Sequence, residues 1–258
     1  MQRRHSAAAV VAIPIRYLPS NAAPHKAKPT TPATLTTEAP LSHYSLKGAQ
    51  HYALHHEKNL RTRITTYRER QLLAKALRHI GPAATVLDLP CGTGRFWSAI
   101  LDCGASTIIA ADNSDGMLTV AREGSPAFAE HLQHNQIQLL NTSIFDVALP
   151  DNAVDVISCM RFFHHLALHQ DRLHVLQELR RVTRKYLLVS LWVDGNLQSA
   201  RRLRKDERTP TTEGYGPRRC VRRAEFASEC QAAGFSIERH YDVAPGWSMW
   251  RLYVLRKN

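Results

Sequence analysis

Short apolar runs alternate with amphipathic stretches through the middle of the chain, from about residue 85 to residue 192. Apolar-rich runs bounded by turn residues predict strands, and they lie at 85–89, 107–111, 137–140, 154–158 and 186–192. Between them, apolar residues at three-to-four spacing predict helices at 96–101, 117–122 and 173–182. Such alternation is typical of α/β proteins with a mostly parallel sheet and helices on both faces.

The region before the first strand divides into two parts. Residues 46–80 carry apolar residues at helical spacing and end at Gly81-Pro82, so they predict a helix. Residues 1–45 are rich in Ala, Pro and Thr, with no acid before Glu38, and predict a disordered N-terminal extension. Whether this extension is a targeting segment, a linker or a misassigned start stays open. We expect a cytoplasmic protein, with organelle targeting or peripheral membrane attachment through this basic segment as the alternative.

The region after residue 192 completes the predicted domain. A basic stretch at about 195–223 interrupts the alternation of strands and helices. A helix is expected at 223–233, and strands at 235–241 and 247–255 are expected to pair as a hairpin at the end of the sheet. The sequence therefore predicts one domain over residues 46–258 with a seven-stranded sheet.

Composition narrows the class of protein. Hydrophobic residues make up 44% and charged residues 22% of the chain, an ordinary globular balance. No apolar run approaches the roughly 20 residues that span a bilayer, so no transmembrane segment is expected. The five cysteines include no C-x-x-C pair, which fits a reducing compartment and argues against a disulfide scaffold. The net charge of +12 favours anionic partners such as nucleic acid, acidic lipid or phosphorylated substrates.

A glycine-rich turn follows the first predicted strand, in the stretch Asp88-Leu-Pro-Cys-Gly-Thr-Gly94. Ligands of open α/β sheets bind at the carboxyl ends of strands, and glycines let them approach the backbone closely. A dinucleotide site is disfavoured, because no third glycine completes G-x-G-x-x-G and Asp88 would repel a pyrophosphate. A P-loop is excluded, since no G-K-[ST] follows. The turn suits a ligand with a cationic or hydroxyl-rich end.

Four ordered motifs resemble the class I S-adenosylmethionine-dependent methyltransferases. The first is the turn 88–94, in which an acid precedes a G-x-G. The second is 111–117, Ala-Asp-Asn-Ser-Asp-Gly-Met, whose Asp112 lies 24 residues after Asp88. The third and fourth are 149–158 and 160–166, which approach and follow the strand at 154–158. The resemblance covers roughly residues 80–195 and implies a Rossmann-like fold with S-adenosylmethionine as the cofactor.

The resemblance also implies which residues hold that cofactor. They are Asp88, Pro90, Cys91, Gly92, Gly94, Asp112, Asn113, Met117, Ser143, Ile144, Asp146 and Arg161. Asp88 would lie near the methionine ammonium, Asp112 would accept hydrogen bonds from the ribose hydroxyls, and Arg161 would face cofactor and acceptor together. Two positions depart from the family's pattern. Pro90 stands where a glycine is usual, and Ser143 stands where an acid often follows the third strand.

A histidine cluster follows the strand at 154–158. His164 or His165 is the candidate catalytic base, because a neutral imidazole can take a proton from an acceptor at pH 7. A histidine pair at this position is also common in the family as a packing element. His165 and His169 have i, i+4 spacing, but no cysteine or acid completes a ligand set, so no metal site is expected.

The acceptor is less constrained than the cofactor. If the basic segment 201–223 lines the acceptor site, it favours a small or lipid-linked, anionic acceptor. Its composition fits a solvated insert as well. RNA is the alternative acceptor, but Tyr215 is the one aromatic in the segment on which a base would stack. A third possibility is a catalytically degenerate, cofactor-binding partner subunit, against which the intact Asp88, Gly92 and Asp112 argue.

Overall fold

The computed structural model describes residues 47–51, 60–124, 126–208 and 218–258. All of them belong to the larger of the two units into which the chain divides, Ala33–Asn258. The extension expected at 1–45, part of the helix expected at 46–80, and Tyr215 lie outside the described residues.

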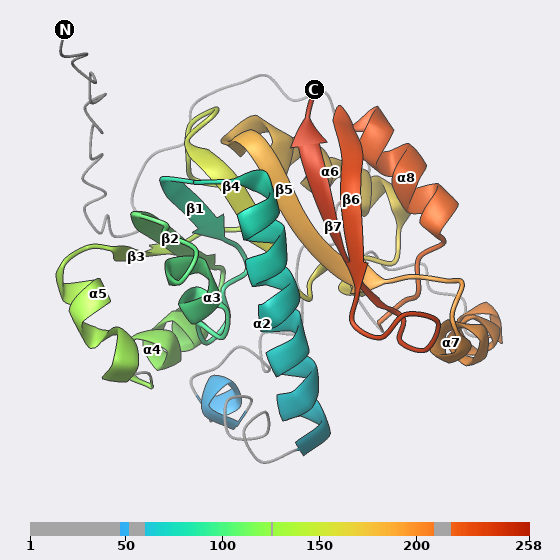
Figure 1. Cartoon of the computed structure of the whole chain (residues 1–258), viewed down its shortest axis with the longest axis horizontal. Helices are drawn as coiled ribbons and strands as arrows, with labels where there is room; N and C mark the ends of the chain where they lie inside the picture. The colour runs from blue at the N-terminus through green and yellow to red at the C-terminus, as the bar shows by residue number, and fades with distance from the viewer. Residues whose placement is uncertain (1–46, 52–59, 125, 209–217) are drawn as a thin grey trace, which may run out of the picture. The chain divides into compact units, whose positions relative to one another are not determined.

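A seven-stranded sheet organises the described residues (Figure 1). Its strands are β1 (Thr85–Asp88), β2 (Thr107–Asp112), β3 (Ile137–Asn141), β4 (Val154–Cys159), β5 (Thr183–Trp192), β6 (Phe235–Asp242) and β7 (Trp250–Lys257). The order is β3-β2-β1-β4-β5-β7-β6. Strands β1 to β5 pair in parallel, and β7 runs antiparallel to both of its neighbours. The predicted mostly parallel sheet and its C-terminal hairpin are confirmed.

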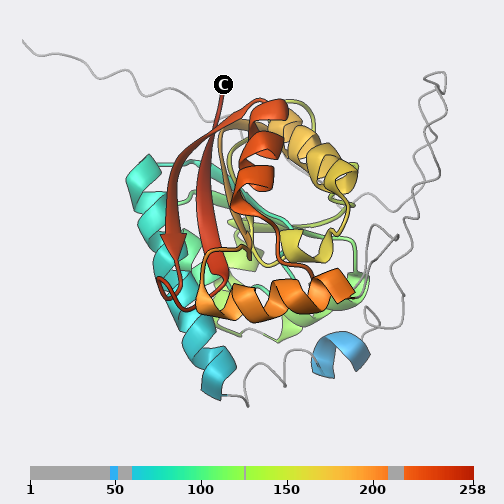
Figure 2. The ribbon, with the colours of Figure 1, turned by 90° about the vertical axis from the view of Figure 1, so that its right-hand side faces the viewer.

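Helices cover both faces of this sheet. They are α2 (Leu60–Ile80), α3 (Trp97–Leu101), α4 (Asp115–Glu123), α5 (Ala129–Gln133), α6 (His169–Val182), α7 (Leu197–Arg208) and α8 (Arg223–Ala232). Figure 2 shows α2 on one side of the sheet and α6 with α8 on the other, and the contacts pair α2 with α3 and α6 with α8. Among these helices, none is both long and apolar enough to cross a bilayer.

The central strands are buried on both faces. Val86 and Leu87 of β1 and Ile157 of β4 are completely inaccessible to solvent. This is why the central strands appear in the sequence as continuous apolar runs and not as alternating ones. Sequence order reverses about β1, because β2 and β3 lie on one side of it and β4 on the other. The carboxyl ends of β1 and β4 therefore form the edge at which open α/β sheets bind ligands.

Within the described residues, the structure adds two α-helices that the hydrophobic pattern did not predict, α5 and α7. Helix α7 occupies the first half of the basic stretch at 195–223, which the pattern treats as an interruption. Asn196 and Ser199 begin the helix with a reciprocal cap: the Ser199 N–H donates to Asn196 Oδ1 at 2.9 Å, and the Asn196 N–H donates to Ser199 Oγ at 3.1 Å. Two backbone bonds fasten its start to the β6–β7 turn, from Leu197 to Gly246 and from Gln198 to Trp247. Tertiary contacts thus hold a helix with few apolar residues.

Candidate functional site at the carboxyl edge of the sheet

The glycine-rich turn after β1 has positive φ angles at both glycines, 54° at Gly92 and 76° at Gly94. The Leu89–Pro90 peptide bond within it is cis. A Cβ on Gly94 would lie 2.8 Å from the ring of Trp97, so the packing admits only glycine there. A Cβ on Gly92 would instead meet no described atom within 4 Å. The backbone at Gly92 therefore borders open space that a ligand can approach.

Asp88 ends β1 and is completely buried. Neither of its carboxyl oxygens has a hydrogen-bond partner among the described residues. Burial raises the pKa of Asp88 to about 7, the nearby Asp112 adds to the rise, and the polar groups of Ser158 and Trp97 offset part of it. The Ser158 hydroxyl, opposite Asp88 in the β1–β4 pairing, and the Trp97 indole nitrogen are themselves without hydrogen-bond partners in this part of the structure. Buried polar groups without partners are rare in folded proteins, and here they point to a bound ligand that would complete them.

Asp112 ends β2 and joins that strand to the glycine turn. Its Oδ2 accepts the Gly92 N–H at 2.9 Å and its Oδ1 accepts the Ser114 N–H at 3.1 Å. A second link runs from the Cys91 N–H to the Ala111 carbonyl at 2.8 Å. Burial raises the pKa of Asp112 to about 6, in spite of these hydrogen bonds. Each carboxylate oxygen keeps a further lone pair, which leaves Asp112 able to accept from ligand hydroxyls as well.

The remaining residues expected at the cofactor differ in exposure. Met117 is buried near the start of α4, whereas Asn113 just before that helix is exposed. Ser143 and Asp146 form an isolated bridge after β3, with Ile144 buried between them and Asp146 exposed. All of these lie on the segments that follow β2 and β3, at the same edge of the sheet as the glycine turn.

Arg161, expected to face cofactor and acceptor, is anchored by a residue outside the motifs. Its guanidinium binds Glu69 of α2 through both carboxylate oxygens, with Nη2 at 2.6 Å from Oε2 and Nε at 3.0 Å from Oε1. Its backbone N–H donates to Ser190 Oγ at 2.8 Å, and its φ of 59° is unusual for a side chain other than glycine. The guanidinium also lies 5.1 Å from the ring centre of Trp250. Sequence patterns did not single out Glu69 or Trp250.

An aromatic cluster surrounds the candidate base; its members are His164, His165, Trp192 and Trp250. The His164 ring stacks on Trp192 at 4.8 Å and meets Trp250 edge-on at 4.9 Å. Burial lowers the pKa of His164 well below its usual value, and burial followed by Arg218 lowers the pKa of His165 to about 4. Both imidazoles are therefore neutral at pH 7 and able to accept a proton, but pKa values this low make them weak bases. His165 is the more accessible of the two.

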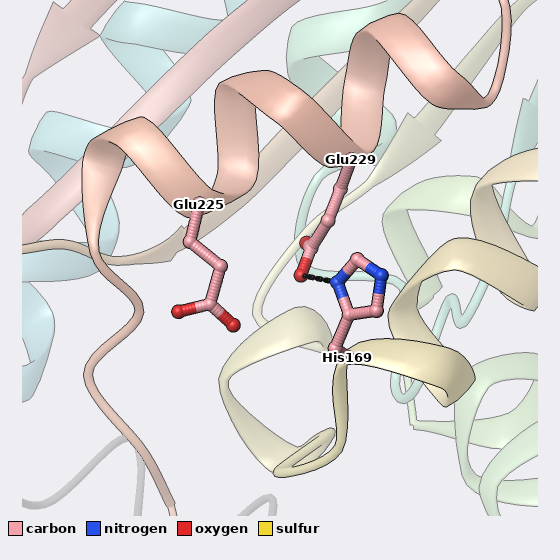
Figure 3. Close-up of side chains that lie close together, drawn as sticks. All are labelled: His169, Glu225 and Glu229. Carbon is pink, nitrogen blue, oxygen red and sulfur yellow. Dashed lines mark hydrogen bonds and ion pairs between the residues drawn. The ribbon is translucent and has the colours of Figure 1, made fainter.

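His165 does not belong to the group of described residues around His169 that could hold a metal. His169 lies against α8, with Glu225 and Glu229 (Figure 3). Its Nδ1 is 2.8 Å from Glu229 Oε1. The ligand atoms of the three residues lie within 4.8 Å of one another, which is a spacing that a metal could bridge. However, Arg172 forms ion pairs with both carboxylates. Since the Arg172 guanidinium already occupies both Glu229 oxygens, the group is best described as an ion-pair network between α6 and α8.

Comparison with known proteins agrees with this arrangement. Residues 87–187 match the family described as Methyltransferase domain. The demethylmenaquinone methyltransferase of Bacillus licheniformis is 29% identical over 110 residues, 42% of this chain and 44% of that protein. A ribosomal protein arginine N-methyltransferase of Schizosaccharomyces pombe is 38% identical over 80 residues, 31% of this chain and 14% of that protein. This chain thus spans less than half the length of the curated relatives it matches.

The fold is shared with a solved structure, magnesium protoporphyrin IX methyltransferase from Synechocystis PCC 6803 with bound SAH. The TM-score is 0.64 at 14% identity, over 84% of this chain and 97% of the other. Residues 87–187 thus match a methyltransferase domain, and the described sheet has the fold of the class I S-adenosylmethionine-dependent methyltransferases. The glycine turn and Asp112 lie inside the matched residues 87–187. Glu69, Trp192 and Trp250 lie outside them, so the family resemblance says nothing about their roles.

Proposed function

We propose that this chain transfers a methyl group from S-adenosylmethionine to a small or lipid-linked acceptor that carries negative charge. The observation that carries the proposal is the buried carboxyl of Asp88, without a hydrogen-bond partner among the described residues, beside a glycine turn that Asp112 holds in place. A carboxyl group in that position needs a cationic or hydrogen-bond-donating partner to be stable as a carboxylate.

The residues present fit S-adenosylmethionine. Asp88 supplies a negative charge for the methionine ammonium, directly or through water. Gly92 gives close access to the backbone, because no described atom fills the space beside it. Asp112 retains lone pairs for the ribose hydroxyls. Asn113, Met117 and the segment Ser143–Asp146 are the proposed flanks of the adenine.

The protein's part in the reaction is mainly positioning. When bound, the cofactor supplies a methyl group on a sulfonium, which is already a strong electrophile. The chain then has to hold the acceptor atom in line with that methyl and exclude competing water. The neutral His165 is the proposed base for an acceptor that must lose a proton, because it is more accessible than His164. An acceptor that is already anionic at the attacking atom would need no base.

The relatives' names support a small acceptor without defining it. Two of them name demethylmenaquinone and magnesium protoporphyrin IX, and a third names a ribosomal protein. Since these acceptors differ in chemical class, the proposal extends to the class of acceptor and not to the atom that is methylated.

Calorimetric titration with S-adenosylmethionine and S-adenosylhomocysteine tests the proposal. We expect both ligands to bind, and Asp88→Asn to weaken both by at least about tenfold, since it removes the charge opposite the ammonium. Asp102→Asn is the matched control, because Asp102 is an exposed carboxylate at the far end of α3 from Trp97. Wild-type protein that binds neither ligand at millimolar concentration would contradict the proposal and favour a partner subunit that holds no cofactor.

RNA remains the second candidate acceptor because of the net charge of +12. Binding that depends on phosphate contacts falls steeply as salt rises. Methylation of RNA that is lost between low and moderate salt would support RNA, whereas salt-insensitive turnover of a small acceptor would exclude it.

A further inference from the structure

We propose that the aromatic cluster (His164, His165, Trp192, Trp250) and the arginines around it form the acceptor site, and that this site selects a planar, conjugated molecule carrying a carboxylate or phosphate. The inference rests on the proposed function for the position of the methyl donor. It goes further by naming the acceptor's chemical class and the side chains that recognise it.

The first observation is the position of the cluster. Trp192 is the last residue of β5 and Trp250 the first of β7, and the two are paired in the antiparallel register. His164 and His165 follow β4, whose Ser158 is paired with Asp88 at the cofactor turn. Because β4 and β5 are parallel neighbours, their carboxyl ends lie side by side. The cluster is therefore next to the turn that we assign to the cofactor, at the same edge of the sheet.

The second observation is flat aromatic surface. Trp192 and Trp250 meet at an interplanar angle of 79° with ring centres 5.5 Å apart. The His164 ring lies nearly parallel to Trp192, at 27°. Trp250 is partly exposed, as is His165. Aromatic faces of this kind bind planar conjugated groups through stacking and edge contacts.

The third observation is positive charge on that aromatic surface. Guanidinium carbons lie over the tryptophan rings at 5.1 Å for Arg161 on Trp250, 5.2 Å for Arg202 on Trp192 and 5.9 Å for Arg218 on Trp192. Glu69 balances Arg161. Since His164 and His165 are neutral, the exposed Arg218 adds positive charge to the cluster. Guanidinium groups bind carboxylates and phosphates through paired, charge-assisted hydrogen bonds.

The fourth observation is unused hydrogen-bonding capacity. His164 Nδ1 and Trp192 Nε1 are buried, and neither has a hydrogen-bond partner among the described residues. Their side chains are at least nine-tenths inaccessible, at 2% and 7% exposure. Buried polar atoms of this kind are costly unless something completes them. An acceptor with a polar substituent would do so here, whereas a purely apolar acceptor would not.

Calorimetry on the S-adenosylhomocysteine-loaded protein tests the assignment with four probes. Hydroxynaphthoate and naphthyl phosphate are planar anions, naphthol is planar but uncharged, and hydroxycyclohexanecarboxylate is an anion that is not planar. We expect at least one planar anion to bind about tenfold more tightly than naphthol and than the non-planar acid. The two planar anions together show whether the site prefers a carboxylate or a phosphate.

Two pairs of variants make the test specific. Arg218→Gln should cost the preferred planar anion about tenfold in affinity and leave naphthol unchanged, while Arg239→Gln, exposed on β6, should change neither. Trp250→Leu should weaken every planar probe, while Trp247→Leu should not, because Trp247 is 61% exposed outside the cluster.

The two proposals fail in different ways. If S-adenosylhomocysteine binds but the four probes bind equally, or Arg218→Gln and Arg239→Gln behave alike, the acceptor assignment is overturned and the proposed function stands. If S-adenosylhomocysteine does not bind at all, both proposals are overturned. A variant that no longer binds S-adenosylhomocysteine would be misfolded. In that case Arg218→Gln, which changes an exposed side chain, decides the acceptor assignment alone.

Discussion

Glu69 of α2 and Arg161 beyond β4 form an ion pair that is almost completely buried, with 2% and 14% of the side chains exposed. It joins positions that are 92 residues apart. The pair connects helix α2 to the edge of the sheet where the glycine turn and the aromatic cluster lie. Helix α2 is therefore more than a cover for the sheet, since it holds an arginine of the proposed acceptor site in place.

Replacing Glu69 by glutamine should destabilise the protein by about 3 kcal/mol, because it leaves a buried guanidinium without its counter-charge. Urea denaturation monitored by circular dichroism measures the change. Glu238→Gln is the control, since Glu238 pairs with His79 at the surface, with 31% of its side chain exposed, and should cost less than about 1 kcal/mol. Equal costs for the two variants would show that the Glu69–Arg161 pair contributes no more than a surface contact.

Asp88 should make the free protein less stable at high pH. Its pKa is about 7 in the folded chain and about 3.9 when unfolded. The folded state thus holds the proton more tightly, so the free energy of unfolding falls as pH rises between these values and then levels off. Asp88→Asn stays neutral and should be about 2–4 kcal/mol more stable than wild type above pH 7, but equally stable near pH 4. Denaturant titrations at both pH values check this, and parallel curves for the two proteins would exclude it.

The same carboxyl predicts a pH-dependent affinity for ligands that carry an ammonium group. Only the ionised form of Asp88 attracts the ammonium of S-adenosylhomocysteine, so affinity should rise with pH up to about 7, the pKa in the free protein. Adenosine lacks the ammonium and should show less of this rise. Calorimetry in buffers of different ionisation enthalpy would detect the released proton. Identical pH profiles for the two ligands would place the ammonium elsewhere.

Three glycines with positive φ should respond differently to alanine. Gly94→Ala should destabilise the fold by several kcal/mol, about 2–4, because the new Cβ would lie 2.8 Å from the Trp97 ring. Gly92→Ala should cost about 1 kcal/mol in stability but sharply weaken cofactor binding, since its Cβ would enter the open space beside the turn. Gly104→Ala, after α3, also has free space around it and should leave binding unchanged. Thermal melts and calorimetry on the three variants separate folding from binding, and equal binding by the Gly92 and Gly104 variants would refute the cofactor assignment.

Zinc should not stabilise this protein through His169, Glu225 and Glu229. Arg172 donates to both oxygens of the buried Glu229 and pairs with Glu225, so it occupies the oxygens that a cation would need. We expect the melting temperature to be the same in EDTA and in equimolar zinc. Arg172→Met, which removes the competing guanidinium, should lower stability without metal. A zinc-induced rise in the wild-type melting temperature would show that the cluster is a metal site.

The amino-acid sequence by itself determined the fold class and the position of the glycine turn. Strands β1 and β2 are buried on both faces, so they appear as uninterrupted apolar runs, and the residues at their ends are contiguous with them. Asp88, Gly92, Gly94 and Asp112 could therefore be found locally. A turn needs particular residue types at fixed spacing, so it can be recognised in the amino-acid sequence alone.

Only the tertiary structure decided how the rest of the edge is built. The pairing of Trp192 with Trp250 depends on the register of β5 against β7, and no local pattern encodes a register between strands 58 residues apart. Glu69 looks like any polar residue of an amphipathic helix until α2 packs and brings it to Arg161. Helix α7 likewise depends on its bonds to the β6–β7 turn. Such contacts cost chain entropy to form and depend on the whole fold, so side-chain type and spacing cannot reveal them.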